Sequence, residues 1–242
     1  MNTQKSAPRL LGAAFLLVAV VSLSSGLLLS SIVGSGSISD ILVHVSHQGT
    51  LLRLGSLGEL VTSAGIVALA GLLYSVLYTQ HKLIALVALG CWLAEAISLA
   101  FSQIGTLALL PVSLDFVQAG APVHSSYQTL GAFLYNGVYN QGITIHMWFY
   151  CLGGMLWYAL FYTSKYIPRV ISLWGLLAVS VALVGIVLQL LGYEVSILVF
   201  LPILPFEVTI GGWLLLRGIK EHRRDVGAPA PSLSTIPSEE TA

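Results

Sequence analysis

Charged residues are scarce in this chain. Only 8% of its 242 residues are Asp, Glu, Lys or Arg, whereas 56% are hydrophobic and the mean hydropathy is +0.89. Soluble domains carry about 25% charged residues, so this composition excludes a soluble globular protein and predicts an integral membrane protein. Ten basic residues balance ten acidic ones, and no long basic block is present. The balance excludes a nucleic-acid partner as well.

Metal-ligating residues are equally few. The helix-borne patterns Glu-x-x-His and His-Glu-x-x-His, typical of di-iron and zinc sites, do not occur. His146 is the single histidine within an apolar stretch, and alone it would supply one axial haem ligand and nothing more. Cys91 and Cys151 both lie in apolar stretches, where packing is favoured over a disulfide or a reactive thiol. The sequence therefore predicts no metal and no cofactor.

Long apolar stretches are what the chain has in abundance. A helix needs about 20 apolar residues to cross a bilayer, and six stretches qualify. We predict an all-α polytopic membrane domain over residues 1–220, with the first span kept as an uncleaved anchor because it is longer than a signal-peptide core. The Pro, Ser and Glu content of 221–242 predicts a disordered tail. The predicted spans are 8–33, 52–80, 83–110, 141–164, 168–192 and 195–218.

The basic residues predict the orientation. Nine of the ten fall on one side of the predicted membrane, and only Arg53 falls on the other. The positive-inside rule places both termini in the cytoplasm and the chain in the cell membrane. On the outer side, the segment 111–140 contains "SSYQTLGAFLYNGVY", whose apolar residues recur at helical spacing. We expect an interfacial helix near 125–139, either packed on the bundle or acting as a lid.

Two carboxyl groups are expected in the middle of the membrane. At about 1.5 Å per helical residue, Glu95 lies about 20 Å beyond Lys82, and Glu207 lies about 15 Å before Arg217. An acid at this depth costs about 2.5–3.5 kcal/mol, so it needs a proton, a cation or water. The same count places Glu59 and His146 near the outer boundary, about 10 Å from the midplane acids. All four are candidate ligand or proton sites, with a hydrogen-bonded packing seam as the alternative.

The stretch "FLPILPFEV" places two prolines beside Glu207. Pro202 and Pro205 are expected to kink the sixth span and to free the carbonyl groups of Leu198 and Leu201. Free carbonyl groups beside an acid are typical of the broken helices of transporter sites. The alternative is a fixed kink in which Glu207 is protonated and bonded to a neighbour.

Several motifs together resemble a known family. They are "SAPRLLGAAFLL", "GCWLAEA", "DFVQAGAP", "YTSKYIPRVISLWGLLA" and "LPILPFEVTIGGWLLLRGIK", and they cover the chain up to Lys220. The chain resembles an uncharacterised bacterial multi-pass membrane family, domain of unknown function 4386. The resemblance implies the topology and a bacterial inner membrane, but no activity is established for the family. Its members often have arginine three residues before the glutamate of the third span, where this chain has Trp92.

Three functions fit these features. The favoured one is non-enzymatic: binding or transport of a small solute or protons through a cavity that contains Glu95 and Glu207. The second is an intramembrane enzyme in which His146 and Glu59 act as base and acid. The third is a membrane scaffold or regulatory partner. The expected partners are the lipid bilayer and a small solute or protons, and the sequence is compatible with a monomer or an oligomer.

Overall fold

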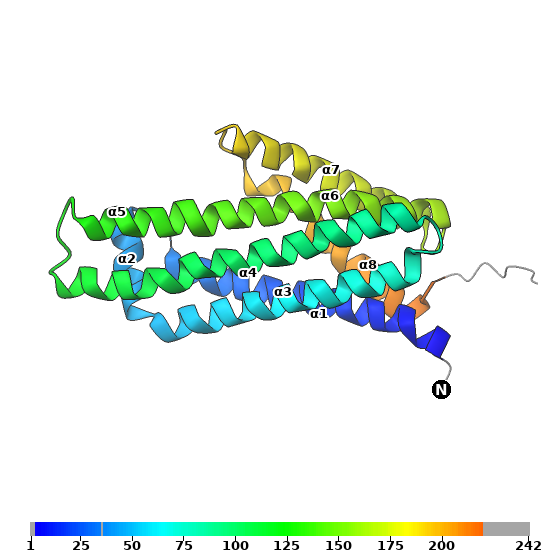
Figure 1. The fold of residues 1–242 in the computed structure, drawn as a ribbon, viewed down its shortest axis with the longest axis horizontal. Coiled ribbons are helices and arrows are strands. Elements are labelled where there is room, and N and C mark those ends of the chain that lie inside the picture. The colour runs from blue at the N-terminus through cyan, green and yellow to red at the C-terminus, as the bar shows by residue number, and fades with distance from the viewer. Residues whose placement is uncertain (1–2, 35, 220–242) are drawn as a thin grey trace, which may run out of the picture.

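The fold is all-α, as predicted. The computed structural model describes residues 3–34 and 36–219, which contain helices and no strand (Figure 1). The predicted tail at 221–242 lies outside the described residues. The helices are α1 (Thr3–Val33), α2 (Ile38–His47), α3 (Gly49–Leu77), α4 (Lys82–Gln118), α5 (Ser126–Ala132), the π-helix η1 (Phe133–Asn140), α6 (Gln141–Ser164), α7 (Arg169–Leu190), the 3-10 helix η2 (Ile197–Val199) and α8 (Ile203–Arg217).

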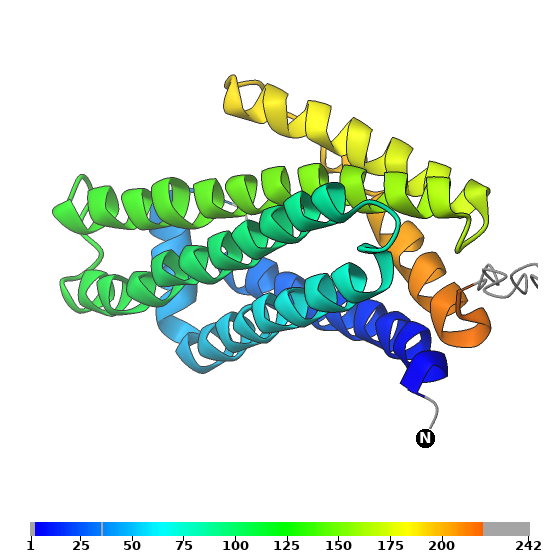
Figure 2. The same ribbon diagram turned by 45° about the vertical axis from the view of Figure 1, so that its right-hand side comes forward.

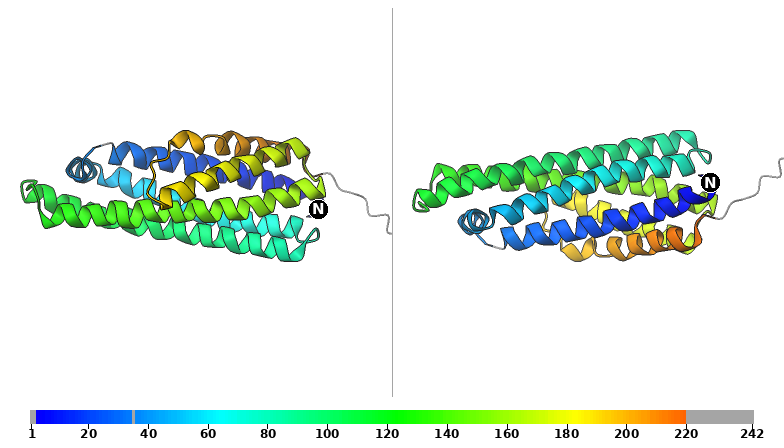
Figure 3. Two further views of the ribbon diagram at one scale, coloured as in Figure 1. Left: turned by 90° about the horizontal axis from the view of Figure 1, so that it is seen from above. Right: turned by 90° about the horizontal axis from the view of Figure 1, so that it is seen from below.

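Six stretches of helix are long and apolar enough to cross a membrane, which confirms the predicted number of spans. They form a ring in which α1, α3, α4, α6, α7 and α8 each pack on the next, and α8 packs back on α1 (Figure 2). The described chain begins and ends at the same end of this ring (Figure 1). At the opposite end, α2 lies across the bundle and is seen end-on in Figure 3. It packs mainly on α4.

Glycines allow the closest helix crossings. A Cβ at Gly12 would lie 2.3 Å from the backbone nitrogen of Leu215, so α1 and α8 touch backbone to backbone. A Cβ at Gly142 would lie 2.6 Å from Ser102 Cβ, which marks a similar approach of α6 to α4. Small residues bring membrane helices together because packing, rather than the hydrophobic effect, drives their association.

Several exposed hydroxyl groups on the ring are bonded within their own helices. Ser24 Oγ donates to the carbonyl oxygen of Val20 at 2.7 Å, and Thr209 Oγ1 donates to that of Pro205 at 2.7 Å. Such bonds satisfy a hydroxyl group without water, as a hydrocarbon environment requires. The surface around them is apolar, with Leu17 and Leu27 more than 60% exposed. The outer face of the ring is therefore suited to lipid.

Two features of the segment 111–140 differ from the sequence-based expectation. Helix α4 continues through Pro111 to Gln118, because α2 and α5 pack on its last turns and offset the single backbone bond that proline removes. The helix expected near 125–139 is present as α5 and η1. It runs on directly into α6, however, and is not a separate helix (Figure 1).

The helix that crosses the end of the bundle was not predicted. Helix α2 follows "GSGS" and lies between the predicted spans 8–33 and 52–80. A capping box starts it: the Ser37 side chain accepts from the Asp40 backbone N–H, and Asp40 Oδ2 accepts from the Ser37 backbone N–H at 2.9 Å. Its buried side chains, Ile41, Leu42 and Val45, then hold it against the bundle.

Candidate functional site

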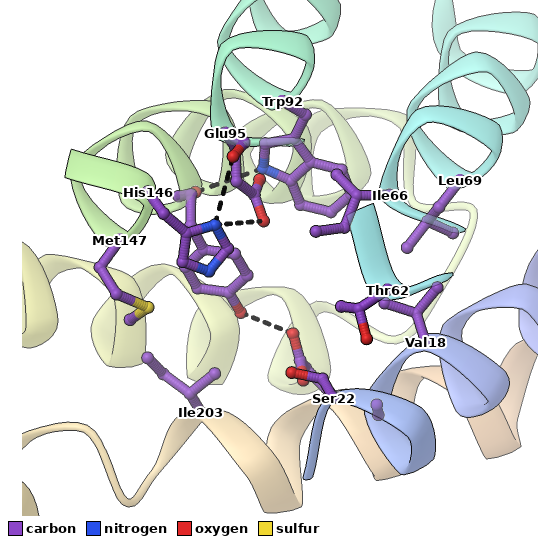
Figure 4. Close-up of a pocket in the computed structure, with 13 residues that line it drawn as sticks. Val18, Ser22, Thr62, Ile66, Leu69, Trp92, Glu95, His146, Met147 and Ile203 are labelled. Carbon is purple, nitrogen blue, oxygen red and sulfur yellow. Dashed lines mark hydrogen bonds and ion pairs between the residues drawn. The ribbon is translucent and has the colours of Figure 1, made fainter. Parts of the chain in front are cut away.

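A cavity of about 160 Å³ lies inside the ring and is lined by residues of α1, α3, α4, α6 and α8 (Figure 4). This volume holds a few water molecules or one molecule of about the size of benzene. Its apolar lining consists of Val18, Ala19, Ile66, Leu69, Trp92, Met147 and Ile203. Its polar lining consists of Ser22, Thr62, Glu95, His146, Tyr150 and Glu207. Both glutamates that were expected at the midplane thus line one cavity.

Glu95 of α4 is the most deeply buried acid of the cavity, with 3% of its surface exposed. Its Oε1 lies 3.9 Å from His146 Nδ1, whereas its Oε2 has no hydrogen-bond partner among the described residues. His146 Nδ1 also lies 3.4 Å from the backbone oxygen of Glu95, which can accept a bond from Nδ1–H. One carboxyl oxygen therefore remains free for a ligand or a proton.

Glu207 of α8 is bonded to Tyr150 of α6. The Tyr150 hydroxyl donates to Glu207 Oε1 at 2.9 Å. About two turns further along α6, Tyr158 meets the ring of Phe206 edge to face, with ring centroids 4.7 Å apart. These two contacts attach the first turn of α8 to α6, although the two backbones do not pack on each other.

Trp92 forms an aromatic wall beside Glu95. It contacts three other rings, since Phe15 and Trp157 meet it edge on while Tyr150 stacks on it. Neither Trp92 nor Tyr150 was among the predicted site residues. The available signal was helical spacing, because Trp92 precedes Glu95 by three positions and Tyr150 follows His146 by four.

The expected distance between His146 and the midplane acids is wrong. That distance comes from counting helical residues along α4 from Lys82 and along α6 from Lys165. The count assumes that Lys82 and Lys165 lie at the same depth in the membrane. The contacts of Trp92 with Gly153 and of Ser102 with Gly142 show instead that Glu95 lies level with about residue 149. The backbone offset to His146 is then about three residues, or about 5 Å, and the two side chains bridge it.

Glu59 of α3 lies outside the cavity. It is 6% exposed, and its Oε1 accepts a hydrogen bond from Ser25 Oγ of α1 at 2.7 Å. The structure therefore places Glu59 and His146 in different clusters and does not bring them together as an acid and a base. It brings His146 to Glu95 instead.

Pro202 and Pro205 start α8 rather than kinking a continuous helix. Pro202 is the residue before the first turn and Pro205 lies within that turn, where the missing N–H groups have no intrahelical partner to lose. The carbonyl oxygen of Leu198, which we expected to be free, accepts from the Leu201 N–H at 3.3 Å. The prolines thus fix the level at which α8 begins, and Glu207 lies just over one turn inside it.

No cluster of three or more His, Cys, Asp or Glu that could hold a metal occurs in residues 3–34 and 36–219. Cys91 and Cys151 are both free thiols, and Cys151 is fully buried. The chemistry that this cavity offers is proton exchange and the binding of a small molecule by two carboxyl groups, an imidazole and a phenol.

The chain has no significant match among curated proteins or solved structures. A family model described as "Domain of unknown function (DUF4386)" matches residues 10–218, which include all six spans apart from the first residues of α1. That stretch also includes every residue of the cavity. This chain is therefore a multi-pass membrane protein and belongs to the DUF4386 family, whose domain is uncharacterised.

Proposed function

We propose that this protein binds a small solute in its central cavity and exchanges a proton with it, as a proton-linked transporter does. The observation that carries the proposal is the free Oε2 of Glu95, a buried acid that faces a cavity shared with a second acid, Glu207. A buried carboxyl group without a partner costs free energy, and this cost is lost when the group holds a proton or meets a cation. A buried acid that lowers stability in this way is expected where the acid serves a function.

Helix α8 is the element that we propose to move. It packs on α1 and α7, and it meets α6 only through side chains such as Tyr150 and Phe206. A solute that donates a hydrogen bond to Glu207 in place of the Tyr150 hydroxyl would release Tyr150 and loosen that side of the ring. Discontinuous helices with a carboxyl group near the break are typical of transporter binding sites.

We also propose that the protein lies in the cell membrane with both termini in the cytoplasm. The basic residues support this orientation, and two of them stack on aromatic rings at the end that carries the termini. Arg169 lies 5.2 Å from the ring centre of Tyr162, and Arg217 lies 5.8 Å from that of Trp213. Aromatic and basic residues gather at membrane interfaces.

Single cysteines, introduced after Cys91 and Cys151 are replaced by alanine, test this orientation. Glu194→Cys lies beyond α7 and should react with a membrane-impermeant maleimide in intact cells. Thr79→Cys, between α3 and α4, should react only after the membrane is permeabilised. The reverse pattern would contradict the proposed orientation.

The transport proposal is tested with protein in liposomes that contain a pH-sensitive dye. A panel of small amines, amino acids, carboxylic acids and sugars is added outside, and proton movement is recorded. The wild type should respond to at least one class, while Glu95→Gln and Glu207→Gln should lose the response. Glu59→Gln makes the same chemical change outside the cavity and should keep it.

An independent measurement asks whether Glu95 holds the proton. Infrared difference spectra recorded across a pH step should contain the C=O band of a protonated carboxylic acid in the wild type. Glu95→Gln should remove that band, and Glu59→Gln should not. A wild type that moves no proton with any solute, and whose spectrum does not depend on Glu95, would end the proposal.

A further inference from the structure

We propose that the cavity opens sideways into the bilayer, between α1, α6 and the first turn of α8, and that it takes up a small lipophilic amine through this mouth. The inference rests on the proposed function, because it names the route and the chemical class of the solute. It is carried by the burial of the lining residues, by the arrangement of the ring and by the chemistry of the cavity.

The exposure of the lining residues differs between the two sides of the cavity. Those from α3 and α4 are buried: Thr62 and Trp92 are each 2% exposed, and Glu95 is 3% exposed. Partial exposure occurs only among the residues from α1, α6 and α8, namely Val18, Ser22, His146, Met147 and Glu207. The cavity is therefore closed toward α3 and α4, and its mouth lies on the other side.

The ring explains why the mouth lies there. Helices α1 and α6 do not pack on each other, and α8 is the helix that lies next to α1 on that side. Helix α8 begins only at Ile203, which lines the cavity, and η2 before it packs on α7 alone. Before α8 begins, η2 is the described helix that continues this wall, and it packs on neither α1 nor α6.

The mouth lies at membrane depth. Ser22 is 14 positions along α1 from Pro8, or about 21 Å, and Glu207 is 10 positions from Arg217, or about 15 Å. Both values fall inside a hydrocarbon layer of about 30 Å. Large exposed side chains beside the mouth are apolar, including Leu23 at 43% and Leu27 at 61% on α1 and Leu201 at 63% just before α8. A molecule that passes this mouth comes from the lipid.

The chemistry of the cavity selects an amine. Two carboxyl groups face it and no Lys or Arg side chain lines it, so an anion would meet repulsion and a cation would be paired. The aromatic face of Trp92 adds a favourable surface for an ammonium group. Apolar walls and a volume of about 160 Å³ limit the rest of the molecule to about the size of benzene.

The proton step balances within the cavity. A neutral amine dissolves in lipid and enters; its nitrogen takes the proton of the Glu95 carboxylic acid. The O–H bond breaks, an N–H bond forms, and an ammonium–carboxylate pair remains.

Helices α1 and α3 contribute only hydroxyl and apolar side chains to the cavity. The titratable groups around Glu95 are Cys91 of α4, His146, Tyr150, Cys151 and Tyr158 of α6, and Glu207 of α8.

Binding of radiolabelled benzylamine to protein in lipid nanodiscs tests the chemical class. Benzylamine should bind at least about tenfold more tightly than benzyl alcohol, which keeps the ring and replaces the amine. Glu95→Gln should weaken benzylamine binding more than about tenfold, and Glu59→Gln should leave it within about twofold.

Thermal unfolding and gel filtration establish that each variant is folded. If Glu95→Gln does not fold, Ser22→Trp, which fills the mouth, replaces it, and Ser24→Trp on the lipid face is its control.

A nitroxide spin label on Ser22→Cys tests the route. Oxygen concentrates in lipid, whereas a neutral nickel chelate stays in water. The label should relax strongly with oxygen and weakly with the chelate, as a label on Ser24→Cys does. Relaxation mainly by the chelate would show an aqueous entrance and overturn the lateral route.

The outcomes separate this inference from the proposed function. Equal binding of benzylamine and benzyl alcohol, or full benzylamine binding by Glu95→Gln, would overturn the inference that the solute is an amine. If another solute class still moved protons in a Glu95-dependent manner, the proposed function would stand without this inference. Loss of proton movement with every solute would remove both.

Discussion

Trp92 and Tyr150 stack across the interface of α4 and α6, with ring planes 8° apart and ring centroids 6.1 Å apart. Trp92 Nε1 also donates to the carbonyl oxygen of Tyr150 at 3.3 Å. The pair fixes the register of the two helices that carry Glu95 and His146. It also leaves the Tyr150 hydroxyl directed at Glu207. Tyr150 therefore contributes both to the register of α4 and α6 and to the docking of α8.

Replacement of Trp92 by leucine should lower the stability of the bundle by about 2 kcal/mol or more, because it removes three ring contacts and leaves a void beside Gly153. The expected result is a lower midpoint of thermal unfolding in detergent. Trp148→Leu, at a partly buried position on the same helix as Tyr150, is the control and should change the midpoint much less. Equal effects of the two substitutions would show that the stacked pair has no special role.

Gly12→Ala should destabilise the docking of α8 on α1. The added methyl group would lie 2.3 Å from Leu215 N and 2.7 Å from the Gly211 oxygen, and neither backbone can move without separating the helices. Overpacking of this kind costs about 1–3 kcal/mol. In Gly212→Ala on α8, the added Cβ has no neighbouring atom within 4 Å, so this substitution should be neutral or slightly stabilising. Thermal unfolding of the two variants checks this, and a stable Gly12→Ala protein would disprove the close crossing.

Ser25→Ala should destabilise the protein through Glu59. The substitution leaves a buried carboxyl oxygen without its donor, at a cost of about 0.5–2 kcal/mol. Ser24→Ala removes an exposed hydroxyl group that donates only to its own helix, and should be close to neutral. Chemical or thermal unfolding compares the two. Proton movement in liposomes should persist in Ser25→Ala, since this pair lies outside the cavity.

The start of α2 should depend on the charge of Asp40. Hydrogen bonds from the Ser37 side chain and backbone hold the pKa of Asp40 below its ordinary value of 3.8. A lowered folded-state pKa means that the stabilisation is present above the unfolded-state value and is lost as the pH falls through the folded-state value. At neutral pH, Asp40→Asn should therefore speed hydrogen exchange of the α2 amides. Asp115→Asn, at an exposed position of α4, should leave their exchange unchanged.

The six spans could be predicted from the sequence because each exceeds the length that a bilayer needs and few charges interrupt them. Helix α2 could not be found in this way, since ten residues are too short to cross a membrane and its capping box lies in a glycine- and serine-rich stretch. The continuation of α4 through Pro111 was missed for the opposite reason. A local rule ends a helix near proline, but packing of α2 and α5 on α4 outweighs the loss of one bond.

The cavity was predictable only in part. Acids are rare in apolar spans, so the sequence identifies Glu95 and Glu207 as candidate site residues. A count of helical rise places the two acids at the same membrane depth. The rise gives no rotation about the helix axis and no register between helices, so it separated His146 from Glu95 and grouped His146 with Glu59 instead. Trp92 and Tyr150 were missed because aromatic residues are common in membrane helices. Their helical spacing from Glu95 and His146 was a weak signal, and the contact between α4 and α6 identifies them.

Helix α8, with 15 residues, is about 22 Å long, whereas α4, with 37 residues, is about 55 Å long. Helix α8 alone therefore falls short of the hydrocarbon thickness, and its span, Ile197–Arg217, includes η2 and the turn before α8, whereas α4 exceeds that thickness. A membrane of longer acyl chains would press more hydrocarbon over the start of α8 than a membrane of shorter ones. We therefore expect the acyl-chain length of the host lipid to affect how α8 docks, and with it the proposed binding of a solute.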